Sequence, residues 1–556
     1  MAKRNKSKSS VSENEPFPIV GVGASAGGLE AFTELLKHLP ANSGMAYVYV
    51  QHLEPSHVSI LPEILGRSTK MPVVQVKQNT LVKPNQVYVI PPNADLALSK
   101  GRLRLSDRPQ TAGMHHSVDF FFQSLAEQKG NQAIGVILSG SASDGTQGLE
   151  AIKAGGGITF AQYEQSARYE FMPRSAVAAG CVDFVLPPKA IAGELMRIID
   201  HPHLAQEEME EGKEFSGKED DFKKILYLVR MRTGDDFSSY KINTLQRRIT
   251  RRMALQKLDR LGKYLQFRRA HPEQVDPLYQ DLLSNVTSLF RDPKVFEALK
   301  RRVFPRLLKD RSPQHPLRIW VVGCSTGQEV YSLAMAFLEH AESVKARTPA
   351  QIFATDINEK ILETARTGLY AKGLLQDVSP ERLRRFFTEE QKGYRVNKAV
   401  RDMCVFARHN IIADPPFSRM DMVSCRNLLI YLEPAQQKRI IPALHYALNP
   451  SGFLVLGKSE STSSFNELFS IEDKQSKIYS KKITVPRLPL GMVHRHELDK
   501  SRYPETPHRA PPVSVSMEMD AQREAERVAL AKYAPPGVVV NADLEILQFR
   551  GSTSPY

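Results

Sequence analysis

Short apolar runs recur through the first third of the chain, and helical spacing follows the first of them. The run at 19–22 precedes a segment whose large apolar residues share one helical face, at positions 29, 32, 35, 36 and 39. Further apolar runs follow at 46–50, 87–90 and 133–138. Buried strands that alternate with helices are typical of a parallel sheet covered on both faces, so this part predicts a doubly wound α/β domain.

A second series of strands and helices lies in the C-terminal half. Residues 319–323 form an apolar run before a tight turn, and helical spacing begins at Glu329. Strands are then expected at 351–354, 404–408 and 421–424. Between these, residues 380–387 are expected to be helical, and 394–397 is expected to pair with 404–407 as a hairpin. The pattern therefore predicts a second α/β domain.

Between the two α/β parts, helical periodicity returns from Asp221, and residues 245–253 are amphipathic. Leu245, Ile249 and Met253 share one face of this helix. The opposite face carries four arginines: Arg247, Arg248, Arg251 and Arg252. Two interpretations remain open, a solvated basic surface and a docking face for an acidic partner helix. Nucleic-acid binding is disfavoured because no aromatic residues interleave the arginines.

Polar segments separate these parts of the chain. Residues 1–14 are expected to form a disordered tail, and the acidic stretch 204–218 a linker. Residues 483–515, rich in proline, histidine and arginine, are expected to form a second linker. After it, 516–532 has helical spacing, and 537–540 with 545–549 predict two strands.

Composition sets limits on the compartment and the class of protein. The chain has 556 residues, of which 42% are hydrophobic, enough for two to four domains. No apolar run is long enough to span a membrane, and the N-terminus lacks a signal-like apolar region, so a cytoplasmic protein is expected. Four cysteines without metal-ligand spacing predict neither a disulfide framework nor a metal site. A net charge of +14 allows a polyanionic partner.

The first candidate site is the turn after the first strand, Gly-Ala-Ser-Ala-Gly-Gly at 23–28. A serine on such a turn, here Ser25, can act as a nucleophile beside backbone N–H groups. A dinucleotide-binding turn is the alternative, but the next strand ends in Gln51-His52 without a ribose-binding acid. The strand at 133–138 leads into a loop with Asp144. Ser25, His52 and Asp144 are thus expected together at one sheet edge. Taken singly, they would be explained as a helix N-cap, a satisfied loop histidine and a turn residue before glycine, respectively.

These residues resemble the chemotaxis receptor methylesterases of the CheB type. The motifs are GASAGG (23–28), QH (51–52), GSASDG (140–145), SVDFFFQSLA (117–126) and MPRSAVAAG (172–180). The resemblance implies a methylesterase domain over 15–203 with Ser25 as nucleophile, His52 as general base and Asp144 orienting it. The backbone amides of Ala26 and Ser141 would form the oxyanion site. No receiver domain fits before residue 17, so phosphorylation control in that form is expected to be absent.

The second candidate site is the turn Gly323-Cys324-Ser325-Thr326-Gly327. Its glycines let backbone approach a ligand closely, although packing alone would also explain such a turn. The following strand ends in Asp356, and an acid at that position suits ribose hydroxyls.

The second half resembles the chemotaxis receptor glutamate methyltransferases of the CheR type. The motifs are NVTSLFRD (285–292), CSTGQEVYS (324–332), ATDIN (354–358) and CRNLLIY (425–431). The resemblance implies a small all-helical domain over 219–295 and a Rossmann-like domain over 296–482 with an inserted antiparallel subdomain. It implies S-adenosylmethionine as the cofactor, with contacts from Asn285, Thr287, Arg291, Glu329, Asp356, Asn410, Ile411, Arg426 and Asn427. Arg291 and Tyr431 would position the substrate carboxylate.

Together these features predict a bifunctional protein that methylates and demethylates glutamate side chains of chemoreceptor-like proteins. Histidine kinases or other two-component proteins are further expected partners; nucleic acid and integral membrane insertion are not expected. The segment YAPPGVVVNADLEILQFRG (533–551) resembles the opening of a PAS domain, with a dimerising helix and short hairpin as the alternative. The competing functions are a signalling scaffold with one or both sites inactive, and a methyltransferase for another substrate with an accessory hydrolase domain.

Overall fold

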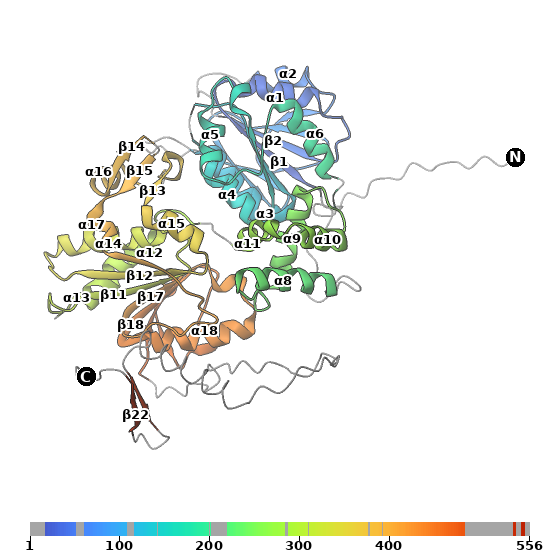
Figure 1. Cartoon of the computed structure of the whole chain (residues 1–556). Coiled ribbons are helices and arrows are strands. Elements are labelled where there is room, and N and C mark those ends of the chain that lie inside the picture. The colour runs from blue at the N-terminus through green and yellow to red at the C-terminus, as the bar shows by residue number, and fades with distance from the viewer. Residues whose placement is uncertain are drawn as a thin grey trace, which may run out of the picture. The chain divides into compact units, whose positions relative to one another are not determined.

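The structure is a computed structural model and comprises two compact units, residues 1–486 and 487–556, which are described separately (Figure 1). It describes residues 17–51, 60–107, 116–141, 143–199, 201, 219–283, 287–309, 311–375, 378–391, 393–483, 537–540 and 546–550. Across these ranges, no helix has both the length and the apolar character needed to cross a bilayer.

The first sheet is entirely parallel, as the fully buried apolar runs predict. Its order is β10-β9-β8-β1-β2-β5-β3. The strands are β1 (Ile19–Ala24), β2 (Ala46–Gln51), β3 (Val73–Gln75), β5 (Gln86–Val89), β8 (Ala133–Ile137), β9 (Ile158–Gln162) and β10 (Phe184–Leu186). Strand β1 lies in the middle, between β2 and β8. The turns after these three strands therefore share one sheet edge, where a ligand site is expected.

Helices cover both faces of this sheet, which confirms the doubly wound class. One face packs on α1 (Gly28–Lys37), α2 (Leu61–Gly66) and α6 (Pro188–Ile199). The other packs on α3 (Ser117–Lys129), α4 (Thr146–Ala154) and α5 (Phe171–Ala178). A separate antiparallel sheet holds β4 (Thr80–Leu81), β7 (Arg102–Asp107) and β6 (Ala94–Ser99). Helix α3 contacts both β6 and β1 and so joins the two sheets.

An all-helical part follows. It comprises α8 (Glu219–Thr233), α9 (Ile242–Leu255), α10 (Leu261–Ala270) and α11 (Val275–Leu282). Leu245, Ile249 and Met253 of α9 face its buried core, as their helical spacing predicts.

The second large sheet has the order β16-β12-β11-β17-β18-β20-β19. Five strands are parallel: β11 (Leu317–Val322), β12 (Ala350–Asp356), β16 (Cys404–Arg408), β17 (Met420–Cys425) and β18 (Leu448–Leu456). Two antiparallel strands, β20 (Ile478–Lys481) and β19 (Phe469–Asp473), complete one side. The predicted Rossmann-like architecture is confirmed.

Helices also cover both faces of this sheet. One face packs on α12 (Pro293–Ala298), a π-helical turn at Leu299–Val303, α13 (Phe304–Leu308), α14 (Gln328–Ser343) and α15 (Glu359–Thr367). The other packs on α18 (Pro434–Ala447). On this second face Trp320 is fully buried, and its indole N–H donates to Thr355 Oγ1 at 3.0 Å.

The predicted antiparallel insert is present, but its predicted strand pairing is wrong. The insert contains β13 (Leu369–Tyr370), α16 (Pro380–Phe386), β14 (Phe387–Glu390), β15 (Gly393–Val396) and α17 (Lys398–Arg401). Strand β15 pairs with β14 and β13, whereas 404–408 is β16, an edge strand parallel to β12. The short spacing between 394–397 and 404–407 suggested a hairpin, but α17 occupies that connection and returns the chain to the main sheet.

In the second unit, β21 (Gly537–Val540) and β22 (Ile546–Arg550) pair antiparallel, close to the predicted strands. The predicted tail 1–14, the linker 204–218 and the helix 516–532 lie outside the described residues. The PAS-like interpretation stays a prediction.

Candidate active sites

The turn that carries Ser25 is fixed by three hydrogen bonds to the backbone groups of this serine. The N–H of Ser25 donates to the carbonyl of Ser139 at 3.0 Å, which ties the turn to the loop after β8. Its carbonyl accepts from the N–H of Gly28 at 3.0 Å and from the amide of Gln51 at 3.2 Å. Gly27 has φ 72°, a conformation that favours glycine and lets α1 begin at Gly28. The half-buried Ser25 thus stands at the edge formed by β1, β2 and β8.

The loop after β8 approaches this turn so closely that it tolerates only glycine at 140. A Cβ on Gly140 would lie 2.0 Å from Met172 Sδ and 3.0 Å from Ser25 Cβ. The hydroxyl of Ser139 donates to the carbonyl of Ala26 at 2.9 Å. Ala26 and the exposed Ser141, the two predicted oxyanion residues, therefore lie on loops that meet at Ser25.

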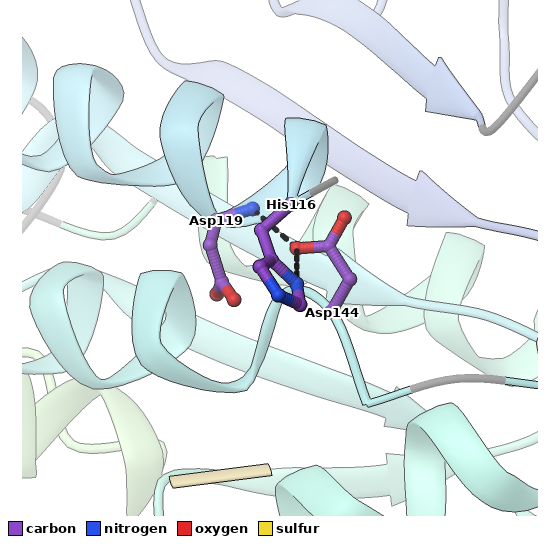
Figure 2. A group of neighbouring side chains, drawn as sticks. All are labelled: His116, Asp119 and Asp144. Carbon is purple, nitrogen blue, oxygen red and sulfur yellow. Dashed lines mark hydrogen bonds and ion pairs between the residues drawn. The ribbon is translucent and has the colours of Figure 1, made fainter. Parts of the chain in front are cut away.

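Asp144 is held by the start of α3. Its carboxylate oxygens accept the backbone N–H groups of Val118 and Asp119, each at 2.9 Å, and the side chain is fully buried. Figure 2 shows His116 beside it, with Nδ1 3.9 Å from Asp144 Oδ1. Backbone N–H groups at a helix N-terminus stabilise a carboxylate, so Asp144 is suited to stay ionised and to orient an imidazole.

A second buried acid, Asp119, belongs to the same cluster. One oxygen accepts the N–H of Gly148 at 2.6 Å, and the other, Asp119 Oδ2, is buried without a hydrogen-bond partner. Burial raises the pKa of Asp119 well above its usual value, and the neighbouring Asp144 raises it further. Asp119 is therefore suited to remain neutral while Asp144 carries the charge.

The predicted base His52 lies outside the described residues. His116, which the sequence analysis did not select, is the described histidine beside Asp144. His116 directly precedes the motif at 117–126. This position before the start of a helix was the feature of the sequence by which it could have been identified. Asp119 lies inside that motif and was also missed.

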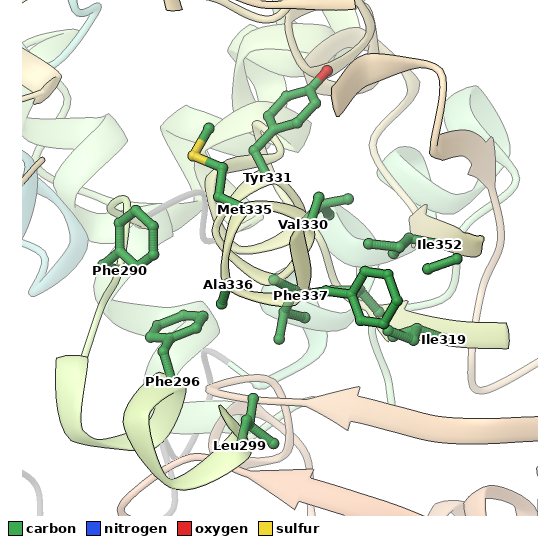
Figure 3. Packing of buried hydrophobic residues seen from close by; sticks show 14 of the residues in the cluster. Phe290, Phe296, Leu299, Ile319, Val330, Tyr331, Met335, Ala336, Phe337 and Ile352 are labelled. Carbon is green, nitrogen blue, oxygen red and sulfur yellow. The ribbon is translucent and has the colours of Figure 1, made fainter. Parts of the chain in front are cut away.

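The second site forms where the turn after β11 meets the end of β12. Gly323, Ser325 and Gly327 have positive φ values of 68°, 50° and 89°. The N–H of Ser325 donates to Asp356 Oδ2 at 2.9 Å, which joins the turn to the predicted acid. Behind the turn, α14 contributes Val330, Tyr331, Met335, Ala336 and Phe337 to the core that it shares with the sheet (Figure 3).

Most of the predicted cofactor residues converge on one cavity at this edge. Those that line it are Thr287, Arg291, Glu329, Asp356, Arg426 and Asn427, and Tyr431, predicted to position the substrate, lines it too. Tyr240, Arg248 and Leu283, from the all-helical part, line it as well. The cavity is thus bounded by the all-helical part on one side and by the sheet turns on the other.

Glu329 is held by two polar neighbours from the end of β17. It accepts from the Ser424 hydroxyl at 2.6 Å, and Arg426 lies 3.3 Å from its second oxygen. The same guanidinium donates to the carbonyl of Arg291 and to the carboxylate of Asp292, both at 2.9 Å. These contacts connect the NVTSLFRD segment to the sheet.

Two residues of that segment have an uncommon backbone conformation. Phe290 and Asp292, on either side of Arg291, have positive φ values of 52° and 59°. Such conformations are rare for residues with a Cβ and collect at functional sites. On the facing side, Arg248 lies over the ring of Tyr431 at 5.4 Å, so both border the cavity from one direction.

This donor set suits S-adenosylmethionine. The oxygens of Asp356 accept the N–H groups of Ser325 and Asn358, which leaves lone pairs for ribose hydroxyls. Burial raises the pKa of Asp356, and the backbone N–H groups oppose that rise. Arg426 Nε is buried without a hydrogen-bond partner. The hydroxyl groups of a ligand match the lone pairs of Asp356, and its carboxylate matches Arg426 Nε. S-adenosylmethionine carries hydroxyl, amino and carboxylate groups.

Three predicted cofactor residues do not join the cavity. Asn285 lies outside the described residues. Asn410 uses its side-chain oxygen to accept the N–H of Ile412 at 3.0 Å, and Ile411 packs on the core beneath α18. Neither Asn410 nor Ile411 is among the residues that line the cavity.

The prediction of an outward-facing arginine surface on α9 is wrong for two of its four members. Arg251 is 3% exposed; its Nε donates to the carbonyl of Gly157 at 2.8 Å, and it forms an ion pair with Asp183. Arg248 donates to the carbonyl of Leu282 and borders the cavity. Arg252 pairs with Asp281 at 3.1 Å, while Arg247 is exposed. Amphipathic spacing identifies the side opposite the local core but not what packs on that side.

Comparisons with known proteins match each part of the chain separately. Residues 20–195 match the family model of the CheB methylesterase. Residues 220–283 match that of the CheR methyltransferase all-alpha domain, and residues 285–478 that of its SAM binding domain. The predicted cofactor, S-adenosylmethionine, is thereby confirmed.

Curated relatives cover both halves. An uncharacterized 104.1 kDa protein of Rhodobacter capsulatus is 33% identical over 89% of this chain. The chain spans about half of that relative, 53% of its length. A putative methyltransferase, Cher3, of Pseudomonas putida is 35% identical over 46% of this chain and 95% of its own. A protein-glutamate methylesterase/protein-glutamine glutaminase of Rhizobium meliloti is 35% identical over 33% of this chain and 52% of its own.

The two resemblances drawn from the motifs are therefore confirmed, and each site lies in the domain that its motifs predicted. The chain belongs to the CheR chemotaxis methyltransferase family and carries, in the same polypeptide, a CheB methylesterase domain.

Proposed function

We propose that this chain both methylates glutamate side chains of chemoreceptor-like proteins and hydrolyses the resulting methyl esters. The observation that supports it most is the presence of two separately built sites. The first combines the Ser25 turn with the buried Asp144, and the second is a cavity lined by Glu329, Asp356 and Arg426. A scaffold with inactive sites would not need both sets of polar side chains intact.

In the esterase reaction, the Ser25 hydroxyl attacks the ester carbonyl and gives its proton to a base, for which His52 is proposed. Methanol leaves, and water then releases the free carboxylate. Asp144, held by two backbone N–H groups, keeps its charge to orient the imidazole. The backbone amides of Ala26 and Ser141 are proposed to stabilise the oxyanion.

In the methyltransferase reaction, S-adenosylmethionine supplies an electrophilic methyl group. Asp356 is proposed to hold its ribose hydroxyls, and Glu329 its amino group. The acceptor carboxylate is already ionised and needs only orientation and exclusion of water. Arg291 and Tyr431, which line the cavity, are proposed to orient it. The exposed Arg247 is the remaining member of α9 available to an acidic receptor helix.

The proposed partners are chemoreceptor-like proteins, with histidine kinases or other two-component proteins as a second class, in the cytoplasm. Glutamate-bearing helices are acidic, and the net charge of +14 supports their attraction to this chain.

The experiment that tests the function uses methyl-labelled S-adenosylmethionine and receptor-containing membranes. Base-labile label on protein and released methanol are followed for the wild type, Ser25→Ala and Asp356→Asn. We expect label with the wild type, lower methanol release with Ser25→Ala, and no label with Asp356→Asn. Ser124→Ala, which changes a serine of α3 away from the site, is the matched control for the serine variant.

Each proposed activity has its own contradicting result. Equal methanol release from the wild type and Ser25→Ala would rule out esterase activity at this serine. Absence of label from every variant, with S-adenosylhomocysteine bound, would point to another methyl acceptor. If S-adenosylhomocysteine also failed to bind, the result would favour the signalling scaffold with inactive sites.

A further inference from the structure

The loop of residues 426–429 begins the connection between β17 and α18, runs from the end of β17 into the 3-10 turn Leu429–Tyr431, and forms part of the cofactor cavity. Arg426, Asn427 and Leu428 all line the cavity. Asn427 has φ 59°, an uncommon conformation for a residue with a side chain. Something outside the loop must therefore hold it in this shape.

That support is Glu460, which lies after β18 and is 4% exposed. Its Oε1 accepts the backbone N–H groups of Leu428 and Leu429 at 2.9 and 2.8 Å. Its Oε2 accepts those of Asn427 and Gly457 at 3.0 and 2.6 Å. All four of these hydrogen bonds come from backbone N–H groups, three of them in the cavity loop.

The loop in turn fixes two other parts of the cavity. The side chain of Leu428 lies against the turn after β11, where a Cβ on Gly323 would be 3.2 Å from it. Arg426, at the start of the loop, contacts Glu329 and Asp292. Displacement of the loop would therefore move the guanidinium that joins the sheet to the NVTSLFRD segment.

We propose that Glu460 is a positioning residue of the methyltransferase: it binds the loop 426–429 by its backbone and so sets the geometry of Arg426 and Asn427 for S-adenosylmethionine. This inference rests on the proposed function of that cavity. It assigns Glu460 no contact with the cofactor.

The substitution Glu460→Gln tests this role in the full chain. Each carboxylate oxygen accepts two N–H groups, so whichever way the amide turns, its NH₂ group faces two donors. Buried donors left without an acceptor are costly, and the loop is expected to shift. Glu467→Gln is the matched control, because Glu467 is an exposed glutamate seven residues further along the same connection.

Binding of S-adenosylhomocysteine is measured by calorimetry, and methyl transfer by the KM for S-adenosylmethionine and kcat. We expect at least tenfold weaker binding and a higher KM for Glu460→Gln, with wild-type values for Glu467→Gln. Ester hydrolysis should stay unchanged in both variants and reports that the N-terminal domain is folded, while the emission of the buried Trp320 reports that the methyltransferase sheet is folded.

If Glu460→Gln does not fold, Gly457→Ala takes its place. A Cβ there would lie 2.8 Å from Glu460 Oε2 and 2.9 Å from the nitrogen of Asn427, so it separates the carboxylate from the loop without removing the charge. Binding within twofold of the wild type for the folded variant, or a lower melting temperature with unchanged affinity and KM, would overturn the positioning role. If the wild type itself fails to bind S-adenosylhomocysteine, the proposed function fails instead.

Discussion

At the residue scale, three acids, Asp144, Asp356 and Glu460, accept hydrogen bonds from backbone N–H groups. Asp144 accepts two of them at the start of α3, Asp356 accepts from Ser325 and Asn358, and Glu460 accepts four. Backbone donors are fixed by the fold, so they hold a carboxylate without the conformational entropy that a long cationic side chain would lose. The position of each acid therefore depends on the backbone conformation of the segments that supply its donors.

The neighbouring acids Asp144 and Asp119 should respond very differently to removal of charge. Asp144→Asn places an amide against two N–H donors and weakens the orientation of the base, so we expect ester hydrolysis to fall by at least a hundredfold. Asp119→Asn keeps an oxygen that accepts the N–H of Gly148, and its amide replaces a carboxyl group that is already suited to be neutral. We therefore expect the rate of ester hydrolysis to fall by no more than about threefold. Ester hydrolysis rates of the two variants, compared after a folding check by circular dichroism, decide this; equal losses would contradict it.

The raised pKa of Asp119 also predicts how stability depends on pH. The folded state retains a proton on Asp119 at pH values where the unfolded chain has lost it. Its contribution to the free energy of unfolding is therefore greatest below the unfolded pKa, about 3.9, and decreases as pH rises towards the folded value. Urea titrations from pH 5 to 8 should show a weaker pH dependence for Asp119→Asn than for the wild type. An identical pH dependence would show that Asp119 is ionised in the folded protein.

At the element scale, α9 is the helix whose environment differs most from its sequence-based interpretation. Its arginines are spaced as on a solvated surface, but Arg251 is buried with Asp183 and the carbonyl of Gly157. Burial raises the pKa of Asp183, yet Arg251 and Lys153 lower it by more, so that it lies below its usual value. An acid with a depressed pKa adds stability above the unfolded pKa and loses it as pH falls through the folded value.

Removing one partner of this buried pair should destabilise the protein strongly. Asp183→Asn leaves the buried guanidinium of Arg251 with Asp281, 3.8 Å away, as its remaining charged partner, and we expect a loss of about 3 kcal/mol in the free energy of unfolding. Asp276→Asn is the control, because its ion pair with Arg232 is half exposed and of little energetic value. Urea denaturation at pH 7 measures both. Equal stability of the two variants would show that Arg251 does not depend on Asp183.

Patterns in the sequence predict local features of this chain but not contacts between positions far apart in it. Strand positions, the parallel strands of the two large sheets and seven cavity-lining residues followed from apolar runs and motifs, because these features are local. The pairing of 404–408 with β12, the burial of Arg251 and the support by Glu460 join positions far apart in the chain, and no local period encodes them. His116 is intermediate: its position was visible, but its proximity to Asp144 required the fold.

At the scale of the whole molecule, the two sites lie in sheets with separate hydrophobic cores. Loss of one site therefore need not inactivate the other, provided the variant folds. A ligand of one cavity should stabilise the domain that holds it by mass action alone.

S-adenosylhomocysteine at a hundred times its Kd should accordingly raise the free energy of unfolding of the methyltransferase domain by about 2.7 kcal/mol. Asp356→Asn should abolish this gain, since the half-buried carboxylate of Asp356 is the proposed ribose ligand. Ser25→Ala should retain it in full. Calorimetric melting with and without the ligand gives the comparison, and an unchanged gain in Asp356→Asn would exclude that role.

Trp320 makes it possible to observe one domain alone. It is the single tryptophan of the chain, fully buried in β11, with its ring 5.1 Å from that of Phe417. Excitation at the red edge of protein absorption, where tyrosines contribute little, therefore yields emission from the methyltransferase sheet and none from the esterase domain. A red shift of that emission reports the exposure of β11 while ester hydrolysis reports the other half, so the order in which the two domains unfold can be read in one sample.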